Sequence, residues 1–215
     1  MDVPPIRRAA AAICVRQGTI GPQVLVVERS ASSRFLPGYV AFPGGAVEDQ
    51  DTANADRWFG DPRESSRAAA VRELAEEVGL ALTGGGLGPA DGDDPFAPVH
   101  ARPPSRAQLI EMAHWIAPPV VPVRFDARYF TVPSEGAPDP RADGVEVSGA
   151  WWIEPRSLYE AWERAERKLY WPTLATVRHL VECETADDIL ALRFETREPT
   201  DDEIASLPLS VTEQD

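Results

Sequence analysis

The sequence contains no run of about 18 apolar residues, which is the length that a membrane-spanning helix requires. The start, MDVPPIRRAAAAICV, has an acidic second residue, prolines and a short apolar run, so it does not resemble a secretory signal peptide. These two absences predict a cytoplasmic protein that does not bind membranes.

Cysteine is scarce, because the chain has 2 cysteines among 215 residues. Cys14 and Cys183 are far apart in the sequence and each lies in an apolar context. We expect two buried free thiols in a reducing compartment, and a disulfide between them is the alternative.

Positive charge is also scarce: 21 Lys and Arg face 35 Asp and Glu, giving a net charge of −14. This balance opposes binding to nucleic acid, which needs clustered cations. An anionic small substrate would need local help from a metal ion or from placed arginines. The three histidines are scattered, and TGGGLG lacks the lysine and serine of a phosphate-binding loop, so neither a zinc site, a catalytic triad nor a Walker loop is supported.

The alternation of strand and helix patterns predicts an α+β fold, in which a mixed β-sheet is sandwiched between helices. A single domain over 1–194 would hold these elements, with C-terminal helices at 155–194 and an acidic, loosely ordered tail at 195–215. Expected strands are 7–18 and 22–30 (a hairpin), 39–42, 115–123, 127–132 and 145–155; expected helices are 62–78, 105–113, 156–168 and 172–183. The remaining segments, a polar one at 50–61 and a glycine-rich one at 83–98, are expected to be loops.

The segment RELAEEVGL places three carboxylates on one turn of the helix that Gly79 ends. At about 100° per residue, Glu73, Glu76 and Glu77 project from one face, opposite an apolar stripe. Like charges at this spacing repel, and a divalent cation such as Mg²⁺ would reverse the sign of that interaction. A solvated acidic face is the alternative. Arg72 precedes Glu76 by four residues and could orient its carboxylate.

The second half of this pattern resembles the Nudix box, which is glycine, five residues, glutamate, seven residues, then R-E-aliphatic-x-E-E-x-G-aliphatic. Glu64 and the segment from Arg72 to Leu80 match it. The first half departs from it, because the separation between Gly45 and Glu64 exceeds five residues. The chain is therefore similar to Nudix enzymes with a long insertion, here at 48–61.

The resemblance implies a Nudix fold and a metal-dependent hydrolase that uses Mg²⁺ or Mn²⁺. It implies metal ligation by Glu73, Glu76, Glu77 and the Gly45 carbonyl, with Arg72 holding a glutamate in place. For the catalytic base it leaves open one of the helix glutamates or Glu146, and Glu146 could equally be a solvated loop residue. Glu64 points away from the carboxylate face, so capping the helix, with Asp61, is as good a role for it as catalysis.

A second signature, RSASSRFLPGYVAFPGG, resembles the motif of coenzyme A diphosphatases within the Nudix superfamily, although the preceding LVV departs from the usual LLT. It implies a CoA-like nucleotide substrate, with CoA or acyl-CoA cleaved to 4′-phosphopantetheine and adenosine 3′,5′-bisphosphate. The implied substrate-binding residues are Arg29, Arg34, Gly44 and Gly45.

Alternatives remain open at this point. The substrate could be another dinucleotide such as NADH or ADP-ribose, and Arg124 and Arg128 are weaker candidates for phosphate contacts. A non-catalytic Nudix-fold nucleotide-binding module is the alternative of another class, although such modules usually lose glutamates that this chain keeps. A homodimer is also left open.

Overall fold

A computed structural model describes residues 5–119, 123–196 and 199–200 of the chain. The chain begins with the expected hairpin, in which β1 (Ile6–Gln17) and β2 (Pro22–Arg29) pair antiparallel. Seven consecutive residues of β1 are buried, because both faces of this strand are covered. Its continuous apolar run, AAAAICV, is the sequence pattern that such a doubly covered strand requires.

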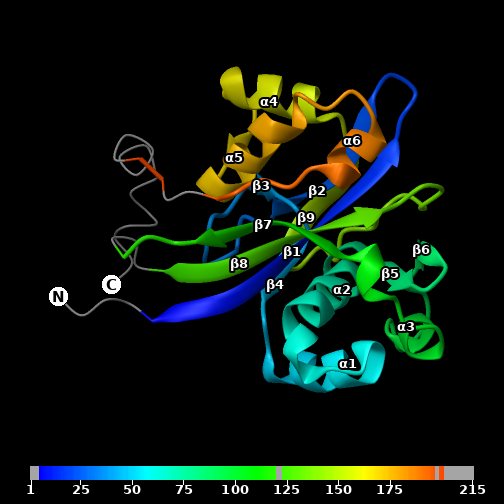
Figure 1. Cartoon of the computed structure of the whole chain (residues 1–215). Helices are drawn as coiled ribbons and strands as arrows, with labels where there is room; N and C mark the ends of the chain where they lie inside the picture. The colour runs from blue at the N-terminus through cyan, green and yellow to red at the C-terminus, as the bar shows by residue number, and fades with distance from the viewer. Residues whose placement is uncertain (1–4, 120–122, 197–198, 201–215) are drawn as a thin grey trace.

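The strands form one mixed sheet with the order β10-β3-β2-β1-β8-β7 (Figure 1). Strand β1 runs parallel to β8 and antiparallel to β2, while β4 pairs with β1 and β9 pairs with β2. The further bounds are β3 Tyr39–Ala41, β4 Gly44–Ala46, β7 Ile110–Ile116, β8 Arg124–Pro133, β9 Val147–Ile153 and β10 Lys168–Leu169.

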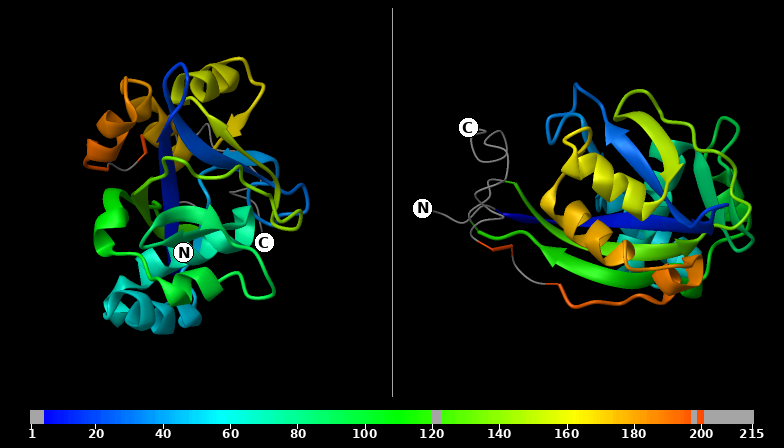
Figure 2. Two further views of the ribbon diagram at one scale, coloured as in Figure 1. Left: turned by 90° about the vertical axis from the view of Figure 1, so that its right-hand side faces the viewer. Right: turned by 90° about the horizontal axis from the view of Figure 1, so that it is seen from above.

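Helices cover both faces of this sheet, as Figures 1 and 2 show. One face carries α2 (Ser65–Val78), with α1 (Asp49–Phe59) and α3 (Ala97–Ala101) beside it. The other carries α4 (Pro155–Glu163), α5 (Trp171–Leu180) and α6 (Ala186–Ala191). A separate cluster of buried apolar side chains lies on each face. The expectation of an α+β fold with a mixed sheet between helices is confirmed.

Helix α2 is preceded by a 3₁₀ turn, η1 (Pro62–Glu64), which Asp61 caps by accepting a hydrogen bond from the Arg63 N–H. The helix ends at Gly79, whose φ of 64° is the left-handed conformation expected there. The prediction that this helix packs by one stripe only is wrong. Nearly all its side chains are buried, because strand β4 passes over the face that carries the glutamates.

The segment 50–61 is not a loop, since most of it forms α1, which is followed by Gly60 in the left-handed conformation. Its buried residues, Asp51, Ala55 and Trp58, recur at helical spacing. The Trp58 indole N–H donates to Nδ1 of His100 at 2.9 Å. This contact ties α1 to α3, and Phe59 also packs against the core.

Three further expectations need correction. The glycine-rich segment 83–98 contributes to a second, two-stranded sheet, in which β5 (Leu80–Thr83) pairs with β6 (Gly86–Pro89). The helix expected at 105–113 is only the 3₁₀ turn η2 (Arg106–Gln108), which has a capping box between Ser105 and Gln108; strand β7 begins at Ile110. The strand expected at 115–123 ends at Ile116, and 120–122 lie outside the described residues.

Helices α4 and α5 overlap the two helices expected at 156–168 and 172–183, although α4 ends at Glu163, and α6 was not predicted as a separate helix. Most of the tail at 195–215 lies outside the described residues. Cys14 and Cys183 are free thiols, which confirms that expectation, although Cys183 is only half-buried. In the part of the chain that the structure describes, no helix is long and apolar enough to cross a membrane.

Candidate functional site

Two glycines bring strand β4 against both the sheet and α2. A side chain at Gly44 would overlap the Ala10 carbonyl of the neighbouring strand β1, and one at Gly45 would overlap the Glu73 carboxylate. Only glycine allows this approach of backbone to carboxylate. The Gly44 N–H donates to Oε2 of Glu77 at 2.9 Å. The FPGG sequence therefore builds one wall of the site directly from backbone.

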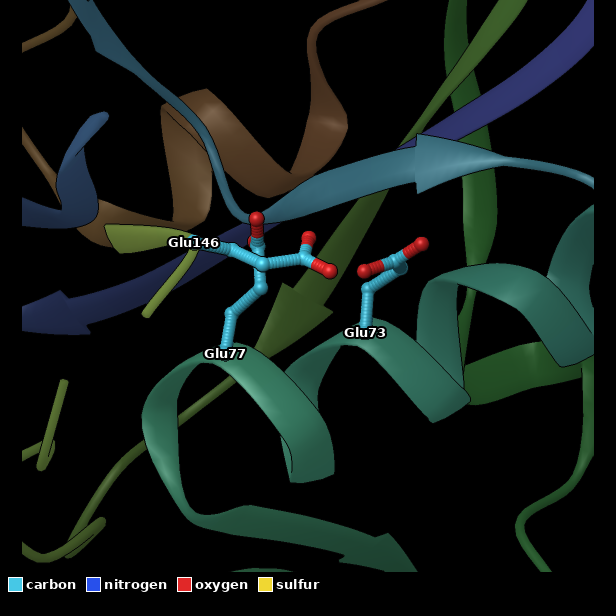
Figure 3. Close-up of side chains that lie close together, drawn as sticks. All are labelled: Glu73, Glu77 and Glu146. Carbon is cyan, nitrogen blue, oxygen red and sulfur yellow. The ribbon is translucent and has the colours of Figure 1, made fainter. Parts of the chain in front are cut away.

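Three carboxylates converge beside this wall. Glu73 and Glu77 come from successive turns of α2, and Glu146 comes from the loop that precedes β9 (Figure 3). Each offers an oxygen that lies within 4.8 Å of the others. Glu73 and Glu77 are buried and Glu146 is exposed. The structure thus brings two box glutamates together with the residue that the sequence suggested as an alternative base.

Burial makes the two helix carboxylates costly to ionise. The pKa of Glu77 is raised to about 8, mainly by burial and then by the charge of the neighbouring Glu73, against the hydrogen bond from Gly44 and the charge of Arg29. Burial likewise raises the pKa of Glu73 to about 7, with Arg72 opposing and Glu76 and Glu146 adding to the shift. The protein alone does not compensate this negative charge.

Arg72 is the central cation of the site and is 3% exposed. Its Nη1 contacts Oε2 of Glu76 at 2.6 Å and Oε1 of Glu73 at 3.0 Å, as the four-residue spacing to Glu76 predicted. Its Nη2 also donates to the Ala46 carbonyl at 2.9 Å. Burial by itself would lower the pKa of Arg72, but these acids together with Asp51 raise it above its usual range.

Asp51, in the first turn of α1, is the partner that the sequence interpretation missed. It is fully buried, and its two oxygens accept from Nε and Nη2 of Arg72 at 3.0 and 3.2 Å. It also accepts the Glu48 N–H at 2.8 Å and so caps α1. A signal was present in the sequence, because five residues separate Gly45 from Asp51, as between the glycine and the acid in the Nudix box.

Glu64, which the sequence interpretation matched to that acid, lies elsewhere. Its carboxylate pairs with Arg67 and with Arg106, on the side of α2 that faces η2. Glu76 also differs from expectation. Its side chain is 40% exposed, it turns toward Arg72, and it does not belong to the cluster of Glu73, Glu77 and Glu146 among the described residues.

The cluster fits a hard divalent cation. Mg²⁺ and Mn²⁺ prefer oxygen ligands, and one or two carboxylates usually hold Mg²⁺ together with substrate phosphates. Two buried carboxylates with raised pKa values need a compensating positive charge, and the Gly45 backbone lies against one of them. Glu73, Glu77 and Glu146 could hold the ion, and Glu76 lines the same cavity.

The site opens into a cavity of about 720 Å³. One end carries the acidic residues of the cluster, together with Glu48, Glu76 and Asp143. The other walls are rich in aromatic rings, which come from the loop before β3, from β3 and the residue after it, from β7 and β8, and from the start of α5: Phe35, Tyr39, Phe42, Trp115, Phe125, Tyr129, Tyr170 and Trp171. Such a cavity suits a ligand with one anionic part and one large uncharged part.

The arginines of the second signature are placed differently from each other. Arg29 lines the cavity, its charge lowers the pKa of Glu77, and its Nε donates to the Phe35 carbonyl at 2.9 Å. Arg34 is exposed and is not among the described residues that line the cavity. Arg128 pairs with Glu111 at 2.6 Å, and Arg124 donates to the Ala117 carbonyl at 3.1 Å; neither is among those lining residues.

Comparisons with known proteins all indicate the same family. The profile of the family described as NUDIX domain matches residues 5–172. The curated protein "Putative nudix hydrolase 7" of Caenorhabditis elegans is 28% identical over 166 residues, which are 71% of this chain and 53% of that protein. The chain thus spans about half the length of this relative. A solved NUDIX hydrolase from Alicyclobacillus acidocaldarius has a TM-score of 0.75 and 30% identity, covering 89% of this chain and 99% of that one.

Proposed function

Since the chain belongs to the NUDIX domain family, we propose that it hydrolyses the pyrophosphate bond of a nucleoside diphosphate linked to another group, with a divalent metal ion as cofactor. The observation that carries this proposal is the convergence of Glu73, Glu77 and Glu146 beside the Gly44–Gly45 backbone at one end of the cavity. A non-catalytic binding module would not need to keep two buried carboxylates at the cost that their raised pKa values imply.

In this reaction water attacks one phosphorus of the pyrophosphate, and the bond from that phosphorus to the bridging oxygen breaks. A bound Mg²⁺ or Mn²⁺ would neutralise the developing charge and make the attacking water more acidic. Glu73, Glu76 and Glu77, with the Gly45 carbonyl, would hold the ion, and Glu146 would contribute to its binding as the third carboxylate of the cluster. Arg72 keeps Glu73 and Glu76 turned toward the cavity by direct contacts.

Glu146 is the residue that we assign as the general base. Glu73 and Glu77 are buried on a helix and are suited to fixed ligation, whereas Glu146 is exposed and can exchange a proton with solvent after each turnover. It would take the proton of the attacking water at its carboxylate oxygen. Arg29, which lines the same cavity, would contact the phosphate oxygens through its guanidinium group.

For the substrate we propose CoA or an acyl-CoA, on the motif that contains Arg29 and Arg34 and on the cavity. The aromatic walls would take the uncharged part of the molecule, and the acidic end would take the metal-bound pyrophosphate. If Asp51 takes the place of the acid in the Nudix box, the residues inserted into the box would follow Asp51, and most of them would lie in α1.

A second candidate is a dinucleotide without a 3′-phosphate, such as NADH or ADP-ribose. Among the described residues that line the cavity, the cations are Arg29 and Arg72, and Arg72 is already committed to carboxylates. This placement favours a substrate that carries no charge beyond its pyrophosphate.

Hydrolysis of CoA, 3′-dephospho-CoA, NADH and ADP-ribose in the presence of Mg²⁺ or Mn²⁺ tests both candidates. Losing a charge-assisted contact to a phosphate costs about 1.5–3 kcal/mol, or about 10- to 150-fold in the specificity constant. If the CoA proposal is correct, the wild type prefers CoA over its dephospho form, and Arg34→Ala shrinks that ratio by about tenfold or more. Metal dependence should not change.

The comparison is a ratio of kcat/KM values, so general damage to the enzyme cancels. Equal use of CoA and dephospho-CoA would contradict the CoA assignment and leave the second candidate. A preference that survives Arg34→Ala would keep CoA as substrate and move recognition of the 3′-phosphate to another residue, such as Arg124.

A further inference from the structure

The loop that carries Glu146 is attached to the end of α2 before it reaches the site. The Arg141 N–H donates to the Val78 carbonyl at 2.9 Å, and the Asp143 N–H donates to the Glu77 carbonyl at 3.1 Å. These carbonyls belong to the last turn of the helix, where no intrahelical donor remains for them. The loop and the helix that bears Glu73 and Glu77 therefore form one hydrogen-bonded unit up to Asp143.

Beyond that point the Asp143 side chain fixes the backbone. Its Oδ1 accepts the N–H groups of Val145, Glu146 and Val147 at 3.1, 3.1 and 3.0 Å, and its Oδ2 accepts the Glu146 N–H at 3.1 Å. On the far side, the Glu146 carbonyl accepts the Ser30 N–H at 2.9 Å. The main chain of Glu146 is thus held from both sides, which fixes the direction of its Cα–Cβ bond.

This arrangement matters because Glu146 is the member of the carboxylate cluster that does not stand on the helix. Glu73 and Glu77 are fixed by burial, whereas Glu146 and Asp143 are exposed and lie on a loop. Exposed loop residues are mobile unless hydrogen bonds hold their backbone. We propose that Asp143 is a positioning residue, which holds the Glu146 main chain so that its carboxylate stays beside Glu73 and Glu77.

This inference rests on the proposed function, because it gives Glu146 a role in hydrolysis. Asp143 acts through Glu146 and does not touch the reacting atoms. Its carboxylate lies at the cavity, but it directs its oxygens at three backbone N–H groups of its own loop. What Asp143 contributes is therefore an acceptor oxygen at a fixed place, and an asparagine Oδ1 can supply the same acceptor.

The first experiment needs neither metal nor substrate. Amide hydrogen exchange of Val145, Glu146 and Val147 is followed by NMR in the metal-free protein, for the wild type, Asp143→Ala and Asp143→Asn. We expect protected amides in the wild type and in Asp143→Asn, and fast exchange in Asp143→Ala. Asp139→Ala, which changes an exposed aspartate of the same loop, is the matched control and should leave the three amides protected. Unprotected amides in the wild type would overturn the inference.

The second experiment measures Mn²⁺ affinity and kcat. Groups that orient a ligand typically change metal affinity or activity by about 10–100-fold, so Asp143→Ala should lose that much of either quantity, while Asp143→Asn stays close to the wild type. In the double variant Asp143→Ala/Glu146→Gln, the loss should not exceed that of Glu146→Gln alone, because both changes remove the same group.

Additive losses would overturn the inference, and so would an Asp143→Asn variant as damaged as Asp143→Ala, which would make the aspartate charge itself the important feature. If no nucleotide is hydrolysed by the wild type, the proposed function fails, and hydrogen exchange and Mn²⁺ binding still decide the role of Asp143. Thermal unfolding of each variant separates loss of the fold from loss of position.

Discussion

At the scale of single residues, identical side chains on one helix have different environments. Glu77 is buried and accepts a backbone hydrogen bond from Gly44, whereas Glu76, its neighbour in sequence, is half-exposed and paired with Arg72. Their spacing in the sequence was enough to predict that these carboxylates share a face of α2. It could not predict their burial, because burial comes from strand β4, which passes over them.

We expect Glu76→Gln and Glu77→Gln each to lower kcat by at least about 10²-fold, which is the scale of losing one preorganised electrostatic group. Glutamine keeps the size of the side chain, so the fold should survive. Steady-state kinetics with Mg²⁺, beside circular dichroism of each variant, measures this. Near-full Mg²⁺-dependent activity in either variant would show that this glutamate is not a metal ligand.

The Asp51–Arg72 pair gives a second prediction at this scale. Removing one partner of a buried ion pair typically costs about 3–5 kcal/mol. In Asp51→Ala, Nε of Arg72 would lose its acceptor, although Nη1 would keep Glu73 and Glu76. Asp51→Ala should therefore lower the free energy of unfolding by that amount, measured by urea denaturation.

Glu64→Gln is the matched control for that measurement. Glu64 pairs with arginines that remain partly exposed, and such pairs contribute about 0–1 kcal/mol. If Glu64→Gln proved as costly as Asp51→Ala, the larger stabilisation expected from the buried Asp51–Arg72 pair would be contradicted.

At the scale of elements, local signals predicted what local residues decide. The β1–β2 hairpin, the start of the α2 region at Asp61 and Pro62, and the end of α2 at Gly79 all lie where turn and capping residues indicated. Helix α1 was missed because most of its residues are polar and only three of them, spaced along one face, are buried. Strands β5 and β6 were missed because TGGGLG lacks the alternation of a strand, and Gly86, the first residue of β6, adopts a φ of 105°.

Helix α1 should depend on Trp58 more than on Phe59. Trp58 is 5% exposed and donates to His100, whereas Phe59 is half-buried. Large-to-small changes at buried aromatic residues cost about 3–5 kcal/mol, so Trp58→Ala should lose that much stability. Phe59→Ala should lose clearly less, and limited proteolysis within 49–60 should accelerate mainly in Trp58→Ala. Equal losses in the two variants would contradict this anchoring of α1.

At the scale of the whole molecule, the net charge of −14 and the two buried carboxylates both disfavour the folded state once the carboxylates are ionised. The pKa values of Glu73 and Glu77 are raised in the folded state to about 7 and about 8, from the ordinary glutamate value of 4.5. Between the unfolded and the folded pKa values, the folded protein binds more protons than the unfolded chain does, so the free energy of unfolding falls as the pH rises.

The metal-free protein should therefore lose stability between about pH 5 and pH 8, as followed by thermal unfolding in the presence of a chelator. Glu77→Gln should show a shallower decline, since one of the two groups no longer titrates. Adding Mg²⁺ or Mn²⁺ should restore stability most at the high end of this range, where the carboxylates are ionised. A Glu77→Gln variant with the same pH dependence as the wild type would contradict the raised pKa.

The course of the chain after α6 has a consequence for how copies of this protein can meet. Strand β7 lies at one end of the sheet order, and its outer edge is contacted by the chain itself: the Phe194 N–H donates to the Met112 carbonyl at 3.3 Å, and Thr196 donates to the His114 carbonyl. At the other end, β10 has only two residues. Exposed strand edges are the usual templates for intermolecular β-sheet growth. A strand from a second molecule could therefore pair with β7 only after residues 192–196 are released. The segment that follows α6 thus protects the β7 edge from intermolecular aggregation.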